Sequence, residues 1–461
     1  MQNKSINLDL NYLKSNMPPG KRVLMACVPA DGHFNPLTGI AKQLQSNGYD
    51  VRWYVSVNYA GKLNKLQIPH YPFHKAMELT ADNVNQAFPE RDAIKNPVKK
   101  LNFDIINFFI KRGPEYFADI QDIYKTFRFD MVIADCAFTA IPFISEKMNI
   151  PVVSIGVFPL TEKSKDLAPN GLALTPAKGI FGKIKHSFLH LLADHLLFRQ
   201  ANKEMKLVLA KEGIETNNMN LFDLLIKKSA LLLQSGTPGF EYKRSDLGRN
   251  IRYIGPLLPY HSPGQVASWF DKRLHEYDKV LLVTQGTVEK NVSKLLQPAL
   301  EAFKDTDALL IVTTGGAQTQ ELKAKYPQKN IIIEDFIRFE DVMPYADAYI
   351  TNGGYGGVML GIQNRLPLIV AGEHEGKNEI NARIGYFNLG INLKTETPTP
   401  LQLKAAVDEV LANNQYKRNV DALANEFGQY DPTILCQYYI ERILKNKQAR
   451  KPLQERRLLE N

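Results

Sequence analysis

The sequence predicts an α/β protein with two doubly wound domains, each built on a parallel sheet. Short apolar runs alternate with helix-like segments between residues 22 and 155, and a second series of this kind starts near residue 279. Such alternation is typical of parallel sheets that carry helices on both faces. Between the two series, RYIGPLLPYHSP (252–263) holds three prolines after a strand-like run, which indicates a linker. The expected division is an N-terminal extension (1–20), a first domain (21–250), a linker region (251–278), a second domain (279–444) and a basic tail (445–461).

The composition favours a globular protein in the cytoplasm. Of 461 residues, 44% are hydrophobic and 23% are charged, which excludes a disordered or collagen-like chain. The three cysteines, Cys27, Cys136 and Cys436, are too few and too scattered for a disulfide framework. Residues 1–20 lack the apolar core of a signal peptide, and no apolar run approaches the ~20 residues of a membrane span. We therefore expect a cytoplasmic protein without stable membrane insertion.

The positive charge is concentrated at the end of the chain. The net charge is +9, and residues 445–461 contribute six basic and two acidic residues. A basic tail could contact nucleic acid or anionic lipid, but a solvated chain end explains it as well. The excess charge on the rest of the chain suits an anionic ligand. We expect no nucleic-acid partner.

The first domain should open with a buried strand at 22–29 (RVLMACVP). Asn35 fits the N-cap of the following helix and Pro36 its first turn, and the helix should end at Gly48. Further strands are expected at 50–56, 129–135 and 151–155, with a helix near 138–148 between the last two.

The less regular stretches 80–128 and 160–228 contain aromatic, amphipathic segments that we interpret as helices around one end of the first domain. The aromatic parts, 102–117 and 181–198, could line an acceptor cleft, although ordinary helix core explains most of them. The second domain should contain five strands: KVLLVTQG, ALLIVTTGG, NIIIED, AYITNGG and PLIVAG. Near the end, YDPTILCQYYIERIL predicts a helix that can pack back onto the first domain.

Polar residues follow two strands of the first domain, and ligands of open α/β sheets gather at the carboxyl ends of strands. After the first strand comes Asp31-Gly32-His33, without the G-x-G-x-x-G of a dinucleotide site. A histidine, with a pKa of about 6.5, can accept a proton at neutral pH, although His33 could also merely cap the next helix. Asp135 ends a strand at the same sheet edge. It could hold the imidazole, or serve as a helix N-cap.

The strongest signal is the glycine-rich turn of the second domain. Tyr349–Gly357 (YITNGGYGG) leaves a strand and enters a helix expected at 358–363. Its glycines allow close approach of a ligand, and their amides at a helix N-terminus suit a pyrophosphate. Gln285-Gly286-Thr287, after the strand KVLLVTQG, could add donors at the same edge.

One further group of residues could be interpreted as a metal site, although a group of histidines without a metal is the stronger interpretation. His186, His190 and Asp194 are four residues apart on one helical face, a spacing that could bind zinc. No further ligand is evident, so we expect histidines without a metal.

Together, these loops resemble the UDP-dependent glycosyltransferases of the GT-B fold, within the natural-product and macrolide group and close to its bacterial type. The first half carries RVLMACVPADGHFNPLTGIAKQL, similar to the family's strand, G-H-x-N-P and helix. The second carries ITNGGYGGVMLGIQNRLPLIVAGEHEGKNEINARIGYFNLGINL, similar to its donor-binding signature. The resemblance implies two Rossmann-like domains that face each other across a cleft, the first for the acceptor and the second for the nucleotide sugar.

The resemblance also implies roles for individual residues. His33 matches the general base that deprotonates an acceptor hydroxyl, and Asp135 matches the carboxylate that orients it. Phe336 falls where an aromatic ring stacks on uracil, with Ile337 backbone groups pairing with the base edge. The full donor-binding set is Gly32, Gly286, Thr287, Phe336, Ile337, Asn352, Gly353, Gly354, Tyr355, Gly356, Gly357, Glu375 and Lys377, of which Thr287 and 353–357 would meet the diphosphate and 375–377 the sugar hydroxyls.

Several residues differ from the family pattern. Asn352 replaces a phosphate-contacting histidine, Gly357 a serine or threonine, and Leu360 a ribose-binding glutamate. Arg338 and Phe339 replace a Pro-Gln pair beside the base. Gly376 takes the position of an aspartate, with Glu375 or Glu373 left to compensate.

The function implied is an inverting transfer of a sugar, glucose by expectation, from a UDP-sugar to a hydroxyl of a small, partly apolar acceptor. No cofactor and no metal are required, because amide dipoles stabilise the leaving diphosphate. Two alternatives stay open. One is a sugar-nucleotide epimerase of the same fold, and the other is a nucleotide-sugar-binding protein without catalysis.

Overall fold

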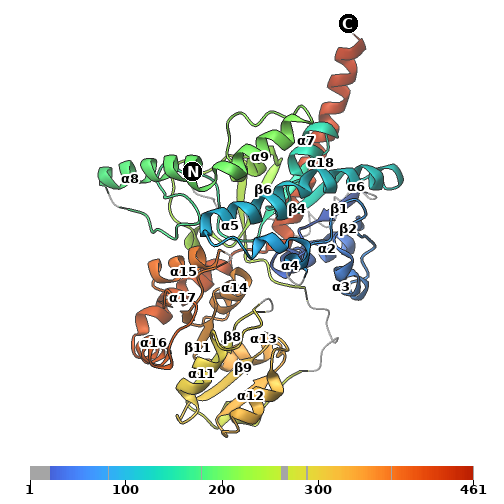
Figure 1. Cartoon of the computed structure of the whole chain (residues 1–461). Coiled ribbons are helices and arrows are strands. Elements are labelled where there is room, and N and C mark those ends of the chain that lie inside the picture. Colours follow the sequence, from blue (N-terminus) through green and yellow to red (C-terminus); the bar gives the residue numbers. More distant parts are fainter. Residues whose placement is uncertain are drawn as a thin grey trace.

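A computed structural model describes residues 21–80, 83–177, 179–260, 268–286, 289–374 and 376–459. The chain forms two lobes, each with a parallel sheet between layers of helices (Figure 1). This confirms the predicted pair of doubly wound α/β domains. The expected N-terminal extension (1–20) lies outside the described residues.

The sheet of the first lobe has seven strands in the order β3-β2-β1-β4-β5-β6-β7, and every strand pair is parallel. Alternate side chains of a strand point to opposite faces. Val23 and Met25 of β1 accordingly join one apolar cluster, and Leu24 and Ala26 join the other. The strands are β1 (Arg22–Ala26), β2 (Asp50–Tyr54), β3 (His70–Tyr71), β4 (Met131–Asp135), β5 (Val152–Gly156), β6 (Leu231–Ser235) and β7 (Ile251–Gly255).

Helices cover both faces of this sheet. One face packs against α2 and α3, and the other against α6, α7, α9 and α10. The helices are α2 (Asp31–Ser46), α3 (Ala60–Lys65), α4 (Val84–Ala87), α5 (Pro97–Asp104), α6 (Arg112–Thr126), α7 (Ile141–Lys147), α8 (Gly179–Leu192), α9 (Arg199–Ala210) and α10 (Leu221–Lys228), with π-helical turns at Ile105–Ile110 and Ala193–Leu197.

The second lobe has a six-stranded parallel sheet in the order β10-β9-β8-β11-β12-β13. One face packs on α14, α15 and α17, and the other on α11, α12 and α16. The strands are β8 (Val280–Thr284), β9 (Leu309–Thr313), β10 (Ile331–Glu334), β11 (Ala348–Thr351), β12 (Leu368–Val370) and β13 (Gly390–Asn392). The helices are α11 (Leu296–Phe303), α12 (Thr319–Lys325), α13 (Phe339–Val342), α14 (Tyr355–Gln363), α15 (Lys377–Tyr386), α16 (Pro400–Ala412) and α17 (Asn414–Phe427).

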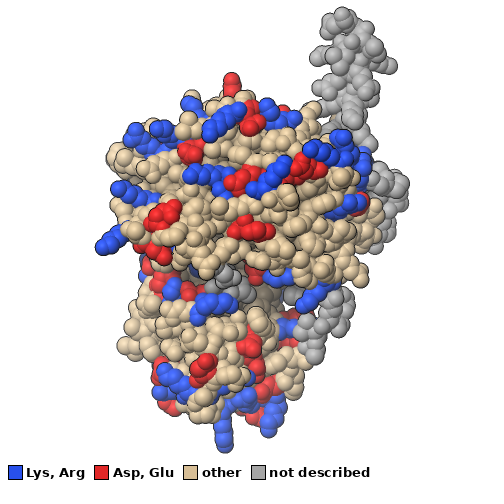
Figure 2. All heavy atoms as spheres, turned by 45° about the vertical axis from the view of Figure 1, so that its right-hand side comes forward, with Lys and Arg blue, Asp and Glu red and all other residues tan. Residues whose placement is uncertain are grey.

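The boundary expected at residue 251 is wrong. β7 pairs with β6 in register Leu232↔Ile251, so it is the last strand of the first sheet. The strand ends just before Pro256, which has no N–H to donate to a sheet ladder. The connection between the lobes therefore starts after Gly255. Basic and acidic side chains are mixed over the face of the two lobes that Figure 2 displays.

The last helix, α18 (Pro432–Leu459), returns to the first lobe, as the sequence indicated was possible (Figure 1). Cys436, Ile440 and Leu444 are buried in the apolar cluster that contains α2. The second domain expected at 279–444 thus contributes its final segment to the core of the first. Within the described ranges, no helix has the length and apolar character needed to cross a bilayer.

Candidate active site

The centre of the first-lobe site is a contact between His33 and Asp135. Asp135 is the last residue of β4, and His33 lies in the first turn of α2, after the neighbouring strand β1. His33 Nδ1 is 2.8 Å from Asp135 Oδ1. Two adjacent parallel strands thus bring together residues that are far apart in the sequence, as predicted from the shared sheet edge.

The helix that carries His33 begins earlier than expected. Its N-cap is Ala30 rather than Asn35, and Pro36 lies inside the helix. A proline this near the N-terminus removes only one intrahelical hydrogen bond, so the helix tolerates it. His33 is therefore a helical residue rather than part of a loop.

Both carboxylate oxygens of Asp135 have hydrogen-bond partners. Its carboxylate is fully buried and also accepts the N–H groups of Val28 and Ala137, each at 2.8 Å. A carboxylate in this position favours the imidazole tautomer with its proton on Nδ1, which leaves Nε2 as a proton acceptor. The His33 side chain is 19% exposed, so the imidazole is partly open to solvent. The bond to Ala137 shows that Asp135 also stabilises the turn after β4.

In the second lobe, the glycine-rich turn links β11 to α14. The helix starts at Tyr355, three residues before the predicted position, so Tyr355, Gly356 and Gly357 form its first turn. Gly353 has a φ of +84°, and a Cβ there would overlap the Asn381 side chain. At Gly356, by contrast, a Cβ would meet no atom within 4 Å. The turn therefore leaves open space beside helix N–H groups that lack intrahelical acceptors.

The side chain of Tyr355 points to the other lobe, so only its backbone faces the glycine-rich turn. Its hydroxyl donates a hydrogen bond to the Ser235 carbonyl, 2.7 Å away, at the end of β6. Helices α14 and α2 are also in contact. The glycine-rich turn and the helix of His33 therefore belong to the two facing sides of one interlobe site.

The loop after β8 lies beside the same turn. Asn352 Nδ2 donates to the carbonyl of Gln285, and Gly286 follows with a φ of +79°. Gln285 Oε1 and Asn381 Oδ1 are both buried without a hydrogen-bond partner among the described residues. Thr287 and Glu375, both predicted donor contacts, lie outside the described residues.

The predicted base platform is an exposed ring. Phe336 follows β10 and is 69% exposed, whereas Ile337 is buried in the apolar core. An exposed phenylalanine beside the carboxyl ends of the strands is available for stacking. Leu360 packs half-buried against the core of the lobe, away from the polar loops.

The loop predicted to contact the sugar is fixed by a carboxylate. The N–H groups of Glu373 and His374 donate to Glu396, at 2.5 and 2.8 Å. Gly376 caps the next helix with a φ of +78°, and Lys377 is that helix's first residue. Gly32, at the start of α2, has open space around it, as a Cβ there would meet nothing within 4 Å.

Comparisons with known proteins agree with this geometry. Residues 297–440 match the family model described as "Erythromycin biosynthesis protein CIII-like, C-terminal domain". The 4'-demethylrebeccamycin synthase of Lentzea aerocolonigenes is 29% identical over 415 residues, which cover 90% of this chain and 97% of that protein. UDP-glucosyltransferase 1 of Beauveria bassiana is 29% identical over 439 residues, covering 88% and 91%. The chain is a glycosyltransferase of the GT-B type.

A solved structure shares the fold of the whole chain. The crystal structure of the glycotransferase of kitacinnamycin superposes with a TM-score of 0.72, covering 93% of this glycosyltransferase and all of that chain, at 18% identity. At this identity the likeness concerns the fold. It confirms the two Rossmann-like domains that the sequence predicted.

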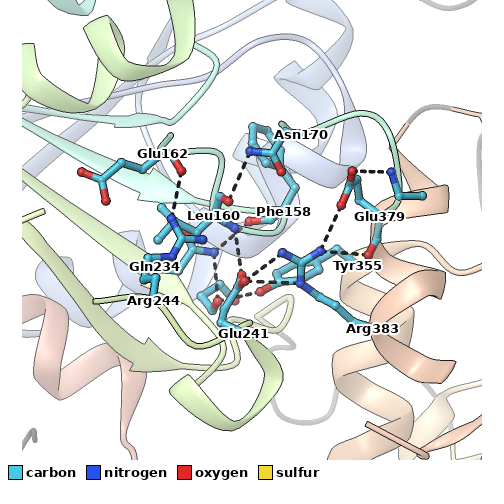
Figure 3. Close-up of polar contacts among 12 residues, drawn as sticks. Phe158, Leu160, Glu162, Asn170, Gln234, Glu241, Arg244, Tyr355, Glu379 and Arg383 are labelled. Carbon is cyan, nitrogen blue, oxygen red and sulfur yellow. Dashed lines mark hydrogen bonds and ion pairs between the residues drawn. The ribbon is translucent and has the colours of Figure 1, made fainter. Parts of the chain in front are cut away.

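The glycosyltransferase also contains a buried charge network between its lobes that sequence reasoning missed (Figure 3). Arg383 of α15 is 1% exposed and contacts Glu241 of the first lobe at 2.9 Å and Glu379 at 3.3 Å. Burial opposes the charge on Arg383, but the two carboxylates outweigh it and raise the pKa of the guanidinium. Glu379 in turn accepts the N–H groups of Gly171 and Ala173, both at 2.8 Å.

This network ties the second lobe to two separate loops of the first. Glu241 also accepts the N–H of Leu160 at 2.8 Å, so it is satisfied on both oxygens. Arg383 lies in the run Asn381-Ala382-Arg383 of the second domain, but its partner Glu241 lies 142 residues away in sequence. No local pattern could have indicated that pairing.

The histidine face considered for zinc has other partners in the glycosyltransferase. His186 Nδ1 lies 3.1 Å from the Asp166 carbonyl, and His190 Nε2 lies 3.0 and 2.9 Å from those of Ser164 and Leu167. Asp194 pairs with Lys163 at 2.7 Å. Over the described ranges, no three or more His, Cys, Asp or Glu side chains are grouped to hold a metal ion.

Proposed function

We propose that this glycosyltransferase is an inverting enzyme that transfers a sugar, with glucose expected, from a UDP-sugar to a hydroxyl of a small, partly apolar acceptor. The observation that carries the proposal is the contact between His33 and Asp135 at 2.8 Å. His33 lies on α2, and α2 is in contact with α14, the helix that follows the glycine-rich turn. Direct displacement at a sugar carbon requires a base that deprotonates the acceptor hydroxyl on one side and a diphosphate site on the other.

The reaction would proceed in one step. As the acceptor oxygen attacks the anomeric carbon, His33 Nε2 takes its proton, and Asp135 stabilises the imidazolium that forms. The bond between the anomeric carbon and the diphosphate oxygen breaks, and UDP leaves with the electron pair. Attack from the face opposite the leaving group inverts the anomeric configuration.

Binding of the donor is assigned to the second lobe. The diphosphate would lie at Gly353–Gly357, where free helix N–H groups and the positive end of the helix dipole favour an anion. The base would stack on Phe336, and Lys377 would reach the sugar. Two buried amide oxygens without partners, Gln285 Oε1 and Asn381 Oδ1, are suited to accept hydrogen bonds from hydroxyl groups of the UDP-sugar.

The proposal needs no cofactor, because the amides at the start of α14 can stabilise the charge that develops on the diphosphate. The three cysteines are free thiols, which is consistent with a reducing cytoplasm.

The test is incubation with a panel of UDP- and dTDP-sugars and a mixed panel of phenolic and lipid acceptors, read by mass spectrometry. The proposal expects free UDP together with an acceptor heavier by one sugar, of inverted anomeric configuration by NMR. An epimerised donor without transfer would indicate the epimerase alternative. Donor binding without any product would indicate a binding protein.

A further inference from the structure

Helix α8 of the first lobe is oriented against the usual rule for an amphipathic helix. Its polar histidines face inward, with His186 2% and His190 8% exposed. Its large apolar residues face outward: Phe181 is 88%, Ile184 61%, Phe188 58% and Leu191 55% exposed. The helix is anchored by its histidines, which contact backbone carbonyls of residues 164–167.

The exposed apolar residues form one strip. Positions 181, 184, 188 and 191 are three or four residues apart, which places them on a single face of a helix. Leu196, 66% exposed, follows in the π-helical turn at the end of α8. A contiguous apolar surface of this kind marks an interaction site, whereas scattered exposed residues do not. We call residues 181, 184, 188 and 191 the α8 strip.

The surroundings of the α8 strip are basic. Residues 179–211 contain six basic residues (Lys183, Lys185, Arg199, Lys203, Lys206 and Lys211) and two acidic ones (Asp194 and Glu204). Asp194 is paired with Lys163 at 2.7 Å, and Lys183 is paired with Asp166 at 3.5 Å. Lys185 is exposed and lies four residues after Phe181 and three before Phe188, so it borders the strip directly.

The position of α8 leaves the strip accessible. Figure 1 shows α8 projecting from the left edge of the first lobe, above α15 and α17 of the second lobe. Phe181 and Phe188 are on the surface, so they do not belong to the helix core that explains most aromatics of 181–198.

We propose that α8 docks the protein peripherally on an anionic lipid bilayer. The α8 strip would enter the interface between headgroups and acyl chains, and the bordering lysines would contact lipid phosphates. Charge favours this partner over a second copy of the chain, because two facing α8 helices would bring like charges together. A strip on one 14-residue helix is also small for the ~800 Å² per partner of a stable dimer.

The inference goes beyond the proposed function and does not depend on it. Docking on a bilayer would bring the first lobe, and with it His33, to the place where apolar acceptors partition. The experiment measures binding alone, so its failure would leave the proposed transfer untouched, and absence of transfer would leave the docking untouched.

The test is co-sedimentation of the full-length protein with vesicles. Vesicles of phosphatidylcholine mixed with phosphatidylglycerol should bind it about tenfold more tightly than pure phosphatidylcholine, and added salt should weaken the binding. The double variant Phe181→Ser/Phe188→Ser should bind the mixed vesicles about tenfold more weakly. The matched control is Leu401→Ser, which removes a side chain that is 77% exposed on α16 of the second lobe and should change nothing.

A second measurement reports insertion directly. In Phe188→Trp, the emission added by the new indole should shift to the blue with mixed vesicles and stay unchanged with pure phosphatidylcholine. Vesicle binding that survives Phe181→Ser/Phe188→Ser but is lost in Arg456→Gln/Arg457→Gln would assign it to the basic tail and overturn the proposal. So would a dimer, seen by sedimentation velocity, that the serine variant dissociates while vesicles do not bind.

Discussion

Gly353 and Gly356 lack side chains for different physical reasons. Gly353 has a left-handed φ of +84° and its Cα lies against Asn381, so the fold itself requires glycine. Gly356 sits in the first turn of α14 with open space where a Cβ would be. In a helix, alanine is more favourable than glycine by about 0.5–1 kcal/mol. A glycine at a helical position with room for a side chain indicates that a ligand approaches the backbone there.

The two positions give a paired prediction. Gly356→Ala should keep or slightly raise the free energy of unfolding while weakening UDP binding by about tenfold, or ~1.4 kcal/mol. Gly353→Ala should instead destabilise the fold itself by more than ~1 kcal/mol, because of its backbone conformation and the overlap with Asn381. Urea denaturation and calorimetric titration of UDP measure both quantities. Unchanged UDP affinity in Gly356→Ala would place the diphosphate elsewhere.

The exposed ring of Phe336 leads to a second prediction. Stacking of a base on an aromatic ring contributes about 1–3 kcal/mol, so Phe336→Ala should weaken UDP binding by that amount. Phe270→Ala is the matched control, because Phe270 is also a largely exposed phenylalanine of the second lobe, 60% against 69%. Equal UDP affinity in the two variants would show that the base does not lie on Phe336.

Among the elements, those with strong local patterns could be predicted from the sequence. The runs RVLMA and MVIAD are buried strands with a shared sheet edge, and that edge was enough to predict the His33–Asp135 contact. Patterns that depend on context were less informative. Pro36 suggested a helix start that lies five residues too late, because a helix tolerates proline within its first turns. Ile251–Gly255 resembled a linker because prolines follow it, although it is a strand.

The long-range charge pairing and the outward apolar face of α8 could not be predicted. Glu241 and Arg383 meet only because the two lobes pack together. The apolar residues of α8 have the spacing of a core-facing helix, and nothing local indicates that the histidines take the inner side. The donor contacts other than the glycine-rich turn and the loop 285–287 came from the family resemblance, and all of these roles stay predictions.

The interlobe network gives an element-scale prediction. Arg383→Met would leave Glu241 and Glu379 buried without their counter-charge, which typically costs about 3–5 kcal/mol. The double variant Glu241→Gln/Arg383→Met removes one of the two stranded charges and should recover part of that loss. Denaturant unfolding followed by circular dichroism measures both. An Arg383→Met protein as stable as the wild type would show that the network does not hold the lobes together.

At the scale of the whole molecule, the two lobes divide the chemistry between them. In the proposed reaction, the first lobe would supply the proton acceptor on α2, and the second would supply the anion site at the start of α14. Tyr355 and Arg383 connect the lobes across the interface. The α18 helix adds a further connection, since its buried residues complete the core behind α2.

This division predicts activity without a divalent cation. The proposed diphosphate site consists of backbone amides and neutral side chains, so treatment with EDTA should leave the initial rate of transfer unchanged. The control is a parallel assay with added magnesium, which should give the same rate. A loss of activity that magnesium or manganese restores would contradict the assignment of leaving-group stabilisation to α14.

The most direct test of the central claim is the His33→Ala variant, assayed for transfer from a UDP-sugar to an aliphatic alcohol and titrated with UDP by calorimetry. General-base catalysis contributes about 10²–10⁴-fold, so the transfer rate should fall by that factor. UDP affinity should stay at the wild-type level, because the diphosphate binds the other lobe. Full transfer to the aliphatic alcohol by His33→Ala would contradict the account and leave His33 with only a structural role at the start of α2.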